Sequence, residues 1–264
     1  MKLTKAQAKA HEQACELLNK ERLDDDERWF VLEHWRAGAR HINTLGGAHF
    51  TPRGLARDFA IEVSSGSVID LCAGIGMLAF CVSHRADLQE RIVCVEINPD
   101  YVEVGRKILP QATWICGDVF QLPVLGHFQF AIANPPFGTS HRGGQSPRYT
   151  GARFEYHVID IASDLANHGV FLIPQQSAPF CFSGRQSFSS VPLEQIPHYR
   201  DFVDRTGIEL TANCGIDTSA YRDDWHDVRP VTEIVTADFA DARDRRSQAS
   251  TADLYAVRSE GSAA

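Results

Sequence analysis

Two regions with different hydrophobic patterns follow each other along the chain. Residues 4–22 are polar, contain several Ala and Lys residues and predict a helix, and residues 23–38 predict a second helix with an acidic first turn. From about residue 67, short apolar runs alternate with longer helical stretches. This alternation predicts a parallel sheet with helices on both faces.

The apolar runs predict seven strands. Five of them cover residues 67–72, 91–97, 112–116, 128–133 and 170–174. Helices are predicted after Gly76, at residues 98–109, at residues 155–169 with Gly169 at the end, and around residues 196–207. The last two strands, residues 208–214 and 231–239, are separated by a loop too short for a crossover helix, so we expect them to be antiparallel.

The same pattern divides the chain into three parts. Residues 1–44 are expected to form a helical N-terminal extension, and residues 45–240 the main domain. Residues 241–264 are rich in Asp, Arg, Ser and Ala and offer little to bury, so we expect a disordered tail.

Composition and charge narrow the class of protein. The 264 residues are 44% hydrophobic and 23% charged, which is ordinary for a globular enzyme. No apolar run is long enough to cross a bilayer, the first residues lack the apolar core of a signal peptide, and the seven cysteines contain no CxxC pair. We therefore expect a cytoplasmic protein without a membrane contact, disulfide framework or metal site. The formal net charge of −8 argues against a surface that grips nucleic acid everywhere, but it allows a local basic groove.

The first predicted strand runs into the sequence VIDLCAGIGMLAF, which places Asp70 at the strand end and small residues in the turn. Gly74 and Gly76 let the backbone approach a ligand that a Cβ atom would hold off, and the helix that follows presents N–H groups. The spacing is not that of GxGxxG, so a dinucleotide fits poorly. A purely structural turn is the alternative interpretation.

Acidic residues follow the next two strands. Glu96 ends the second strand, where a carboxylate can accept hydrogen bonds from both hydroxyls of a ribose. Asp118 follows the third strand, where it could accept from the exocyclic amine of an adenine, with Val119 or Phe120 beside the ring. Each acid alone is more often an exposed charge or a turn residue. Their order after the Gly-rich turn favours a nucleoside site.

The sequence ANPPFG, residues 133–138, follows the fourth strand. Pro135 and Pro136 fix their own φ, donate no N–H and push the preceding residue towards extended geometry. The segment can therefore continue neither as a helix nor as an interior strand. We expect a rigid ledge that holds Asn134 and Phe137 at the carboxyl edge of the sheet, where open α/β sheets bind ligands.

These motifs resemble an ordered set from a known family. Asp70-x-Cys72-x-Gly74-x-Gly76, Glu96, Asp118 and Asn134-Pro135-Pro136-Phe137 look like the motifs of class I S-adenosylmethionine-dependent methyltransferases. The segment GGAHFTPRGLARDF resembles the one that precedes the Gly-rich motif in adenine-N6 DNA methyltransferases with the cofactor half first. The resemblance covers roughly residues 45–175. It implies a Rossmann-like sheet of seven strands, mostly parallel with an antiparallel last strand, and S-adenosylmethionine as the cofactor.

The resemblance also implies roles for individual residues. The cofactor-binding set is Phe50, Thr51, Pro52, Asp70, Cys72, Gly74, Gly76, Glu96, Ile97, Asp118, Val119 and Asn134. The catalytic set is Asn134, Pro135, Pro136 and Phe137. If the Asn134 side-chain oxygen and the Pro135 carbonyl each accept one N6 hydrogen of adenine, the nitrogen lone pair localises and can attack the methyl group. Phe137 would stack on a base rotated out of its helix.

The segment after the ledge, GTSHRGGQSPRYTGARFE, is basic within an acidic protein. His141, Arg142, Arg148 and Arg153 could follow phosphates, and Tyr149 could stack on a base. A solvated loop without a partner is the alternative interpretation.

We therefore expect methyl transfer to the N6 amine of adenine in nucleic acid, with DNA favoured over RNA. No long target-recognition domain is evident, and NPPFGT is also similar to small structure-specific RNA adenine-N6 methyltransferases. Two further alternatives are methylation of a protein glutamine amide and a binding protein that retains the fold with a retired site.

Overall fold

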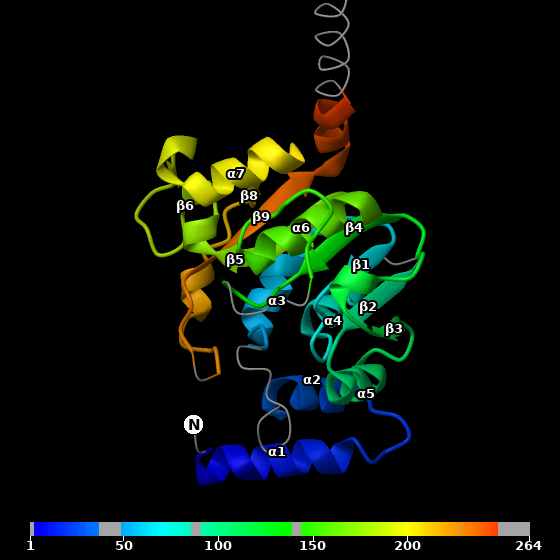
Figure 1. The fold of residues 1–264 in the computed structure, drawn as a ribbon. Coiled ribbons are helices and arrows are strands. Elements are labelled where there is room, and N and C mark those ends of the chain that lie inside the picture. The colour runs from blue at the N-terminus through cyan, green and yellow to red at the C-terminus, as the bar shows by residue number, and fades with distance from the viewer. Residues whose placement is uncertain (1–2, 37–48, 86–90, 139–143, 227, 248–264) are drawn as a thin grey trace, which may run out of the picture.

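A seven-stranded sheet with the strand order β3-β2-β1-β4-β5-β9-β8 forms the centre of the protein (Figure 1). The computed structural model describes residues 3–36, 49–85, 91–138, 144–226 and 228–247. Within these residues, no helix combines the length and the apolar character that crossing a bilayer requires.

The direction of the strands follows the expected plan. The strands of the sheet are β1 (Val68–Asp70), β2 (Ile92–Glu96), β3 (Thr113–Cys116), β4 (Phe128–Ala133), β5 (Ala166–Pro174), β8 (Thr211–Ala212) and β9 (Thr232–Asp238). β1 to β5 are parallel, whereas β9 is antiparallel to both β5 and β8. The prediction of a Rossmann-like, mostly parallel sheet with an antiparallel last strand is confirmed.

Helices cover both faces of the sheet (Figure 1). They are α1 (Lys5–Leu17), α2 (Asp25–His34), α3 (Arg53–Phe59), α4 (Met77–Ser83), α5 (Pro99–Ile108), α6 (Phe154–Leu165) and α7 (Pro197–Thr206). Successive strand residues point to opposite sides, so that Val68 enters the core beneath α3, α4 and α5 while Ile69 enters the core beneath α6 and α7. The sheet therefore separates two apolar cores.

The N-terminal extension is docked on the side of α5. α1 and α2 each begin with a capping box, in which Thr4 pairs with Gln7 and Asp24 with Glu27. α2 packs on α5, and Trp29 of α2 lies edge-on to Phe80 of α4 with ring centroids 4.8 Å apart. Both helices are shorter than predicted, and burial of their apolar side chains joins them to the first core.

The predicted helix over residues 155–169 is too long. α6 ends at Leu165, and residues 166–169 belong to β5, where Ala166 pairs with Phe128 and Gly169 pairs with Ala237. Gly169 is thus a strand residue rather than a helix cap, and a Cβ atom there would come within 2.3 Å of the Phe171 ring. Pairing with two neighbouring strands overrides the local helical pattern.

Other differences concern short elements. The strand predicted over residues 208–214 is limited to β8, the segment after β5 contains a small hairpin of β6 (Phe180–Cys181) and β7 (Ser189–Ser190), and α3 was not predicted. The predicted tail begins inside a helical segment, residues 239–247, in which Ala242 is buried. Arg243 in this segment donates to the carbonyls of Ser163 and Ala166 at 3.0 Å. Residues 248–264 lie outside the described residues.

Candidate active site at the carboxyl edge of the sheet

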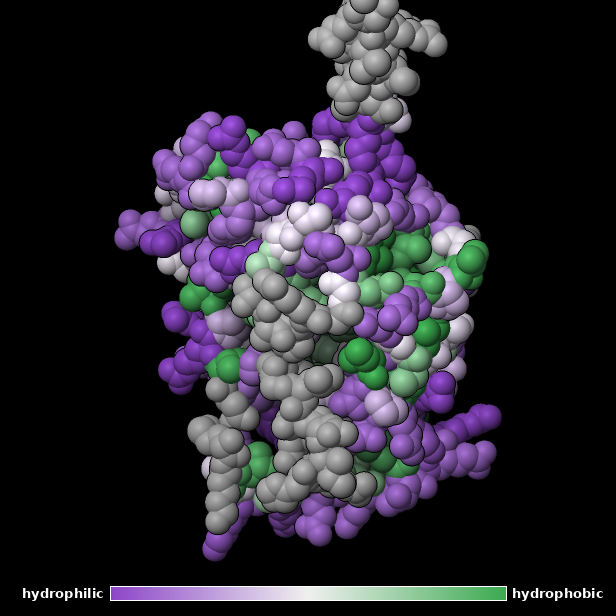
Figure 2. Space-filling view, viewed as in Figure 1, coloured by the Kyte–Doolittle hydropathy of each residue, from purple (hydrophilic) through white to green (hydrophobic). Residues whose placement is uncertain are grey.

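A cavity of about 380 Å³ lies at the carboxyl ends of β1, β2 and β4. It is lined by most of the predicted site residues, namely Phe50, Thr51, Asp70, Cys72, Gly74, Glu96, Ile97, Asp118, Val119, Asn134, Pro135, Pro136 and Phe137. Figure 2 shows that apolar residues gather over the side of this face where β1 to β4 lie, whereas α7 is covered by polar ones. The fold thus brings five separate sequence segments to one cavity.

The Gly-rich turn and Glu96 hold each other in place. The N–H of Gly74 donates to Glu96 Oε2 at 2.9 Å, and the N–H of Asn98 donates to Glu96 Oε1 at 2.8 Å. Burial raises the pKa of the Glu96 carboxyl, and these backbone N–H groups act in the opposite direction. Each carboxylate oxygen keeps one further lone pair that can accept a hydrogen bond from a ligand.

The two glycines of the turn have different positions. Gly74 has φ +55° and lines the cavity, where a Cβ atom would come within 3.3 Å of the Phe50 ring. Gly76 has φ +97°, begins α4 and faces the Trp114 ring, which a Cβ atom would approach to 3.1 Å. Gly76 and Pro52 are not among the residues that line the cavity, and their contact with the cofactor stays a prediction. Gly76 instead shapes the turn that presents Gly74.

Asp70 is a buried carboxyl group at the wall of the cavity. It is fully buried, and neither of its oxygens makes a hydrogen bond of normal geometry. Burial raises its pKa to about 7, although the backbone N–H groups of Cys72 and Ala79 act in the opposite direction. Burial also raises the pKa of the neighbouring Cys72 thiol, which therefore stays neutral. An unpaired carboxyl beside a cavity is suited to a cationic ligand.

Asp118 follows β3 and is the N-terminal cap of a short helix. Its Oδ1 accepts from the N–H of Phe120 at 3.0 Å and begins the short helix Val119–Gln121. Oδ2 accepts no hydrogen bond from the described residues. This oxygen and the apolar side chain of Val119 can therefore meet a flat, amine-bearing ring in the cavity.

The Asn134 side chain is fixed by the segment that precedes α3. Its Nδ2 donates to Thr51 Oγ1 at 2.9 Å and to the carbonyl of His49 at 3.3 Å. No described residue donates to Asn134 Oδ1. Pro135, which follows, is buried, so the ledge is packed into the protein on one side and open to the cavity on the other.

The far end of the ledge is tied to α6. The N–H of Gly138 donates to Oε2 of the buried Glu155 at 3.1 Å, and the Gly138 carbonyl accepts from the N–H of Phe154 at 3.0 Å. Glu155 Oε1 accepts from Ser177 Oγ at 2.7 Å. Gly138 has φ +87°, which allows the chain to turn sharply after Phe137.

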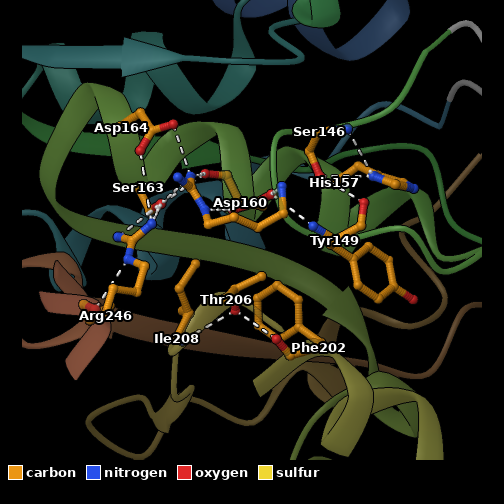
Figure 3. A network of polar contacts seen from close by, with 12 residues as sticks. Ser146, Tyr149, His157, Asp160, Ser163, Asp164, Phe202, Thr206, Ile208 and Arg246 are labelled. Atoms are coloured by element: carbon orange, nitrogen blue, oxygen red, sulfur yellow. Dashed lines mark hydrogen bonds and ion pairs between the residues drawn. The ribbon is translucent and has the colours of Figure 1, made fainter. Parts of the chain in front are cut away.

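The described part of the basic loop does not present its cation and ring to a ligand. Arg148 Nε lies 2.6 Å from Oδ1 of the buried Asp160, and Arg148 Nη2 lies 2.8 Å from Asp164 Oδ2. Figure 3 shows the polar contacts around Asp160, Ser163 and Asp164 of α6. Tyr149 is 1% exposed and packs against Phe202. The predicted phosphate contact of Arg148 and base stacking of Tyr149 are corrected: both residues anchor the loop to α6 and α7.

The other basic residues of the loop are Arg153, His141 and Arg142. Arg153 immediately precedes α6, where Nη1 lies 3.9 Å from Glu155 Oε1, and it is not among the residues that line the cavity. His141 and Arg142 lie outside the described residues. The predicted phosphate contacts of His141, Arg142 and Arg153 therefore stay predictions.

Several residues of the cavity were not predicted. They include His49, Met77, Leu78, Tyr101 and Phe154. Tyr101 packs edge-on to Phe50 with centroids 5.3 Å apart, and Trp35 at the end of α2 packs on both rings at 5.7 and 6.0 Å. Tyr101 lies in the first turn after the Asn98 cap, which is a usable sequence signal, but Trp35 is brought to the site only by docking of the N-terminal extension.

Comparison with known proteins gives a family match and several structural neighbours. Residues 52–164 match the methyltransferase small domain family. A Listeria monocytogenes protein, proposed to be a class I S-adenosylmethionine-dependent methyltransferase, is 13% identical with a TM-score of 0.50, over 89% of this chain and 81% of that one. A proposed RNA methyltransferase from Pyrococcus horikoshii is 16% identical with a TM-score of 0.48, over 86% and 97%. The M. jannaschii tRNA m1G37 methyltransferase is 17% identical with a TM-score of 0.43, over 72% and 47%. No curated protein matches the chain.

The chain has a Rossmann-like methyltransferase fold, and residues 52–164 of it are similar to the methyltransferase small domain family. S-adenosylmethionine is the cofactor that this family and fold imply.

Proposed function

We propose that the protein transfers a methyl group from S-adenosylmethionine to the N6 amine of adenine in nucleic acid, with DNA as the favoured acceptor. The observation that carries the proposal is the fixed Asn134 amide on a proline ledge, in the same cavity as Gly74 and Glu96. The ledge supplies acceptors for an amine, and the rest of the cavity is suited to a nucleoside with a cationic group.

The residues of the cavity fit the cofactor. Gly74 leaves a cradle that a Cβ atom would narrow, Asp70 is an unpaired carboxyl for a cationic group, and Glu96 has lone pairs for two ribose hydroxyls. Asp118 Oδ2 would accept from the adenine amine of the cofactor, with Val119 and Ile97 against the ring. When bound, S-adenosylmethionine supplies a methyl group on a positively charged sulfur, which is a strong electrophile.

The ledge would activate the acceptor nitrogen. The N6 lone pair of adenine is delocalised into the ring, so the free amine is a weak nucleophile. Asn134 Oδ1 and the Pro135 carbonyl each accept one N6 hydrogen and draw the nitrogen towards tetrahedral geometry, which localises the lone pair. With its lone pair localised by these two acceptors, the nitrogen would be placed to receive the methyl group that S-adenosylmethionine supplies, and the extra N6 proton would pass to solvent.

Phe137 would hold the base in place. It follows the two prolines, lines the cavity and is half-buried, so one face of its ring can stack on a base that has left its helix. DNA is favoured because the segment GGAHFTPRGLARDF, which resembles adenine-N6 DNA methyltransferases, contains Thr51 in direct contact with Asn134.

The test is transfer of labelled methyl groups from S-adenosylmethionine to adenine-containing DNA, to RNA of the same sequence and to a glutamine-containing protein, with N6-methyladenine measured by mass spectrometry. We expect N6-methyladenine in DNA above the level in RNA. Asn134→Ala is expected to lower the rate by at least about 100-fold with cofactor binding retained. Equal rates for wild type and Asn134→Ala would contradict the mechanism, label in glutamine alone would contradict the acceptor, and calorimetry without cofactor heat would point to a retired site.

A further inference from the structure

Among the described residues, the Asn134 side chain makes two hydrogen bonds, and both run to the segment before α3. Thr51 Oγ1 accepts from Asn134 Nδ2 at 2.9 Å, and the His49 carbonyl accepts from the same nitrogen at 3.3 Å. Thr51 is 5% exposed, so solvent competes little for this contact. Two acceptors from a distant part of the sequence therefore share the two amide protons.

These contacts decide which way the amide is turned. A backbone carbonyl can only accept, so the group that faces His49 must be the NH₂ of Asn134. Rotating the amide by half a turn would place two oxygens opposite each other. Oδ1 is thereby left as the amide atom without a partner among the described residues, on a side chain that lines the cavity.

The segment that carries Thr51 is itself held by aromatic packing. The Phe50 ring packs on Trp35 of the N-terminal extension and on Tyr101 of α5, with centroid distances of 6.0 and 5.3 Å, and a Cβ atom at Gly74 would come within 3.3 Å of it. Thr51 therefore cannot move away from Asn134 without disturbing this cluster. The N-terminal extension contributes to the cavity through Trp35.

We propose that Thr51 is a positioning residue, which turns the Asn134 amide so that its oxygen faces the acceptor amine. This inference rests on the proposed function, because it assigns the orientation on which activation of the amine depends. This role uses the Thr51 hydroxyl as the acceptor for Asn134 Nδ2, and the O–H of the same hydroxyl stays available as a donor.

The kinetic test compares Thr51→Val with Thr51→Ser. Valine keeps the shape of threonine but cannot accept a hydrogen bond, whereas serine keeps the acceptor. We expect kcat for methyl transfer to fall about tenfold in Thr51→Val, with the KM for S-adenosylmethionine nearly unchanged, and to recover in Thr51→Ser. Thr206→Val is the matched control, because Thr206 is a buried threonine in α7 whose hydroxyl binds Phe202 O, away from the cavity. It is expected to lower stability without changing kcat.

A second readout needs no acceptor. In protein labelled with ¹⁵N-asparagine, the Asn134 side-chain NH₂ signals, identified by their loss in Asn134→Asp, are expected to shift in Thr51→Val and to stay in place in Thr51→Ser. If the signals do not move in Thr51→Val, or if Thr51→Ser loses as much kcat as Thr51→Val, the inference is wrong. A wild type that methylates no adenine would overturn the proposed function, while the NMR comparison would still decide the orientation of the amide.

Discussion

Gly138 and Glu155 are joined by a hydrogen bond of 3.1 Å from a backbone N–H to a fully buried carboxylate, and this bond fixes the end of the proline ledge to α6. The second oxygen of the same carboxylate accepts from Ser177 after β5. One side chain thus connects the segments that follow two neighbouring strands. The ledge is therefore fixed at both ends, by Thr51 at Asn134 and by Glu155 at Gly138.

Glu155→Ala tests this connection. The change leaves the Gly138 N–H and the Ser177 hydroxyl without their acceptor in a buried site, and we expect the free energy of unfolding to fall by about 2–5 kcal/mol. The rate of methyl transfer should fall as well, because the ledge is released. Denaturant unfolding and methyl transfer under conditions where the variant is folded check both effects.

Glu155→Gln is the matched control for this change. Its amide oxygen can accept from Gly138 while its NH₂ donates to Ser177 Oγ, since a hydroxyl can reverse its role. Most of the stability should therefore be retained. Equal stability of Glu155→Ala and wild type would show that the bond does not hold the ledge.

The raised pKa of Asp70 predicts that the stability of the cofactor-free protein depends on pH. Burial raises its folded pKa to about 7, above the ordinary aspartate value of 3.8, so between these pH values the folded state binds a proton that the unfolded state has lost. Asp70 should therefore lower the free energy of unfolding as pH rises through this range, by up to about 1.4 kcal/mol per pH unit. Asp70→Asn should remove that slope in denaturant unfolding at several pH values. An unchanged slope would mean that another group titrates.

The same carboxyl predicts a pH dependence of cofactor affinity. A cationic ligand favours the ionised form of Asp70, so the affinity for S-adenosylmethionine should increase as pH rises from about 5.5 to about 7.5, with release of a proton on binding. Calorimetry in buffers of different ionisation enthalpy measures both quantities. Asp70→Asn should bind more weakly and with a flatter pH profile, and a wild type with no proton release would contradict the assignment.

At Gly105 we expect alanine to be less favourable than glycine, which is the reverse of their usual order of helix propensity. Alanine in an exposed helix interior is normally more stable than glycine by about 1 kcal/mol. At Gly105 of α5, however, a Cβ atom would come within 2.2 Å of the Trp114 ring, which is 8% exposed and also faces Gly76. We expect Gly105→Ala to destabilise the protein by about 1–3 kcal/mol and to weaken cofactor binding through the Gly76 turn.

Thermal or denaturant unfolding of a small set of variants checks this expectation. Glu103→Ala, at an exposed position of the same helix, should change stability by less than about 0.5 kcal/mol. Trp114→Phe makes room for the new methyl group, so the double variant Gly105→Ala with Trp114→Phe should be less destabilised than the sum of the two single changes. Strict additivity would mean that the ring and the helix do not interact.

The sequence by itself determined the strand plan and the order of the motifs at the carboxyl edge of the sheet. Both depend on local properties: the alternation of apolar residues, the glycine turn, and the prolines after β4, whose fixed φ ends the strand wherever it lies. The antiparallel direction of the last strand was also predicted, and β9 runs antiparallel to both β5 and β8.

Only the tertiary structure decided where the polar side chains of the loops point and where some elements end. Arg148 and Tyr149 belong to a basic sequence segment, yet the buried Asp160 and the ring of Phe202 draw them inwards. Residues 166–169 continue a helical pattern, yet β4 and β9 make them a strand. Each of these outcomes depends on partners far away in the chain, and the free energy of such contacts has no local signature in the sequence.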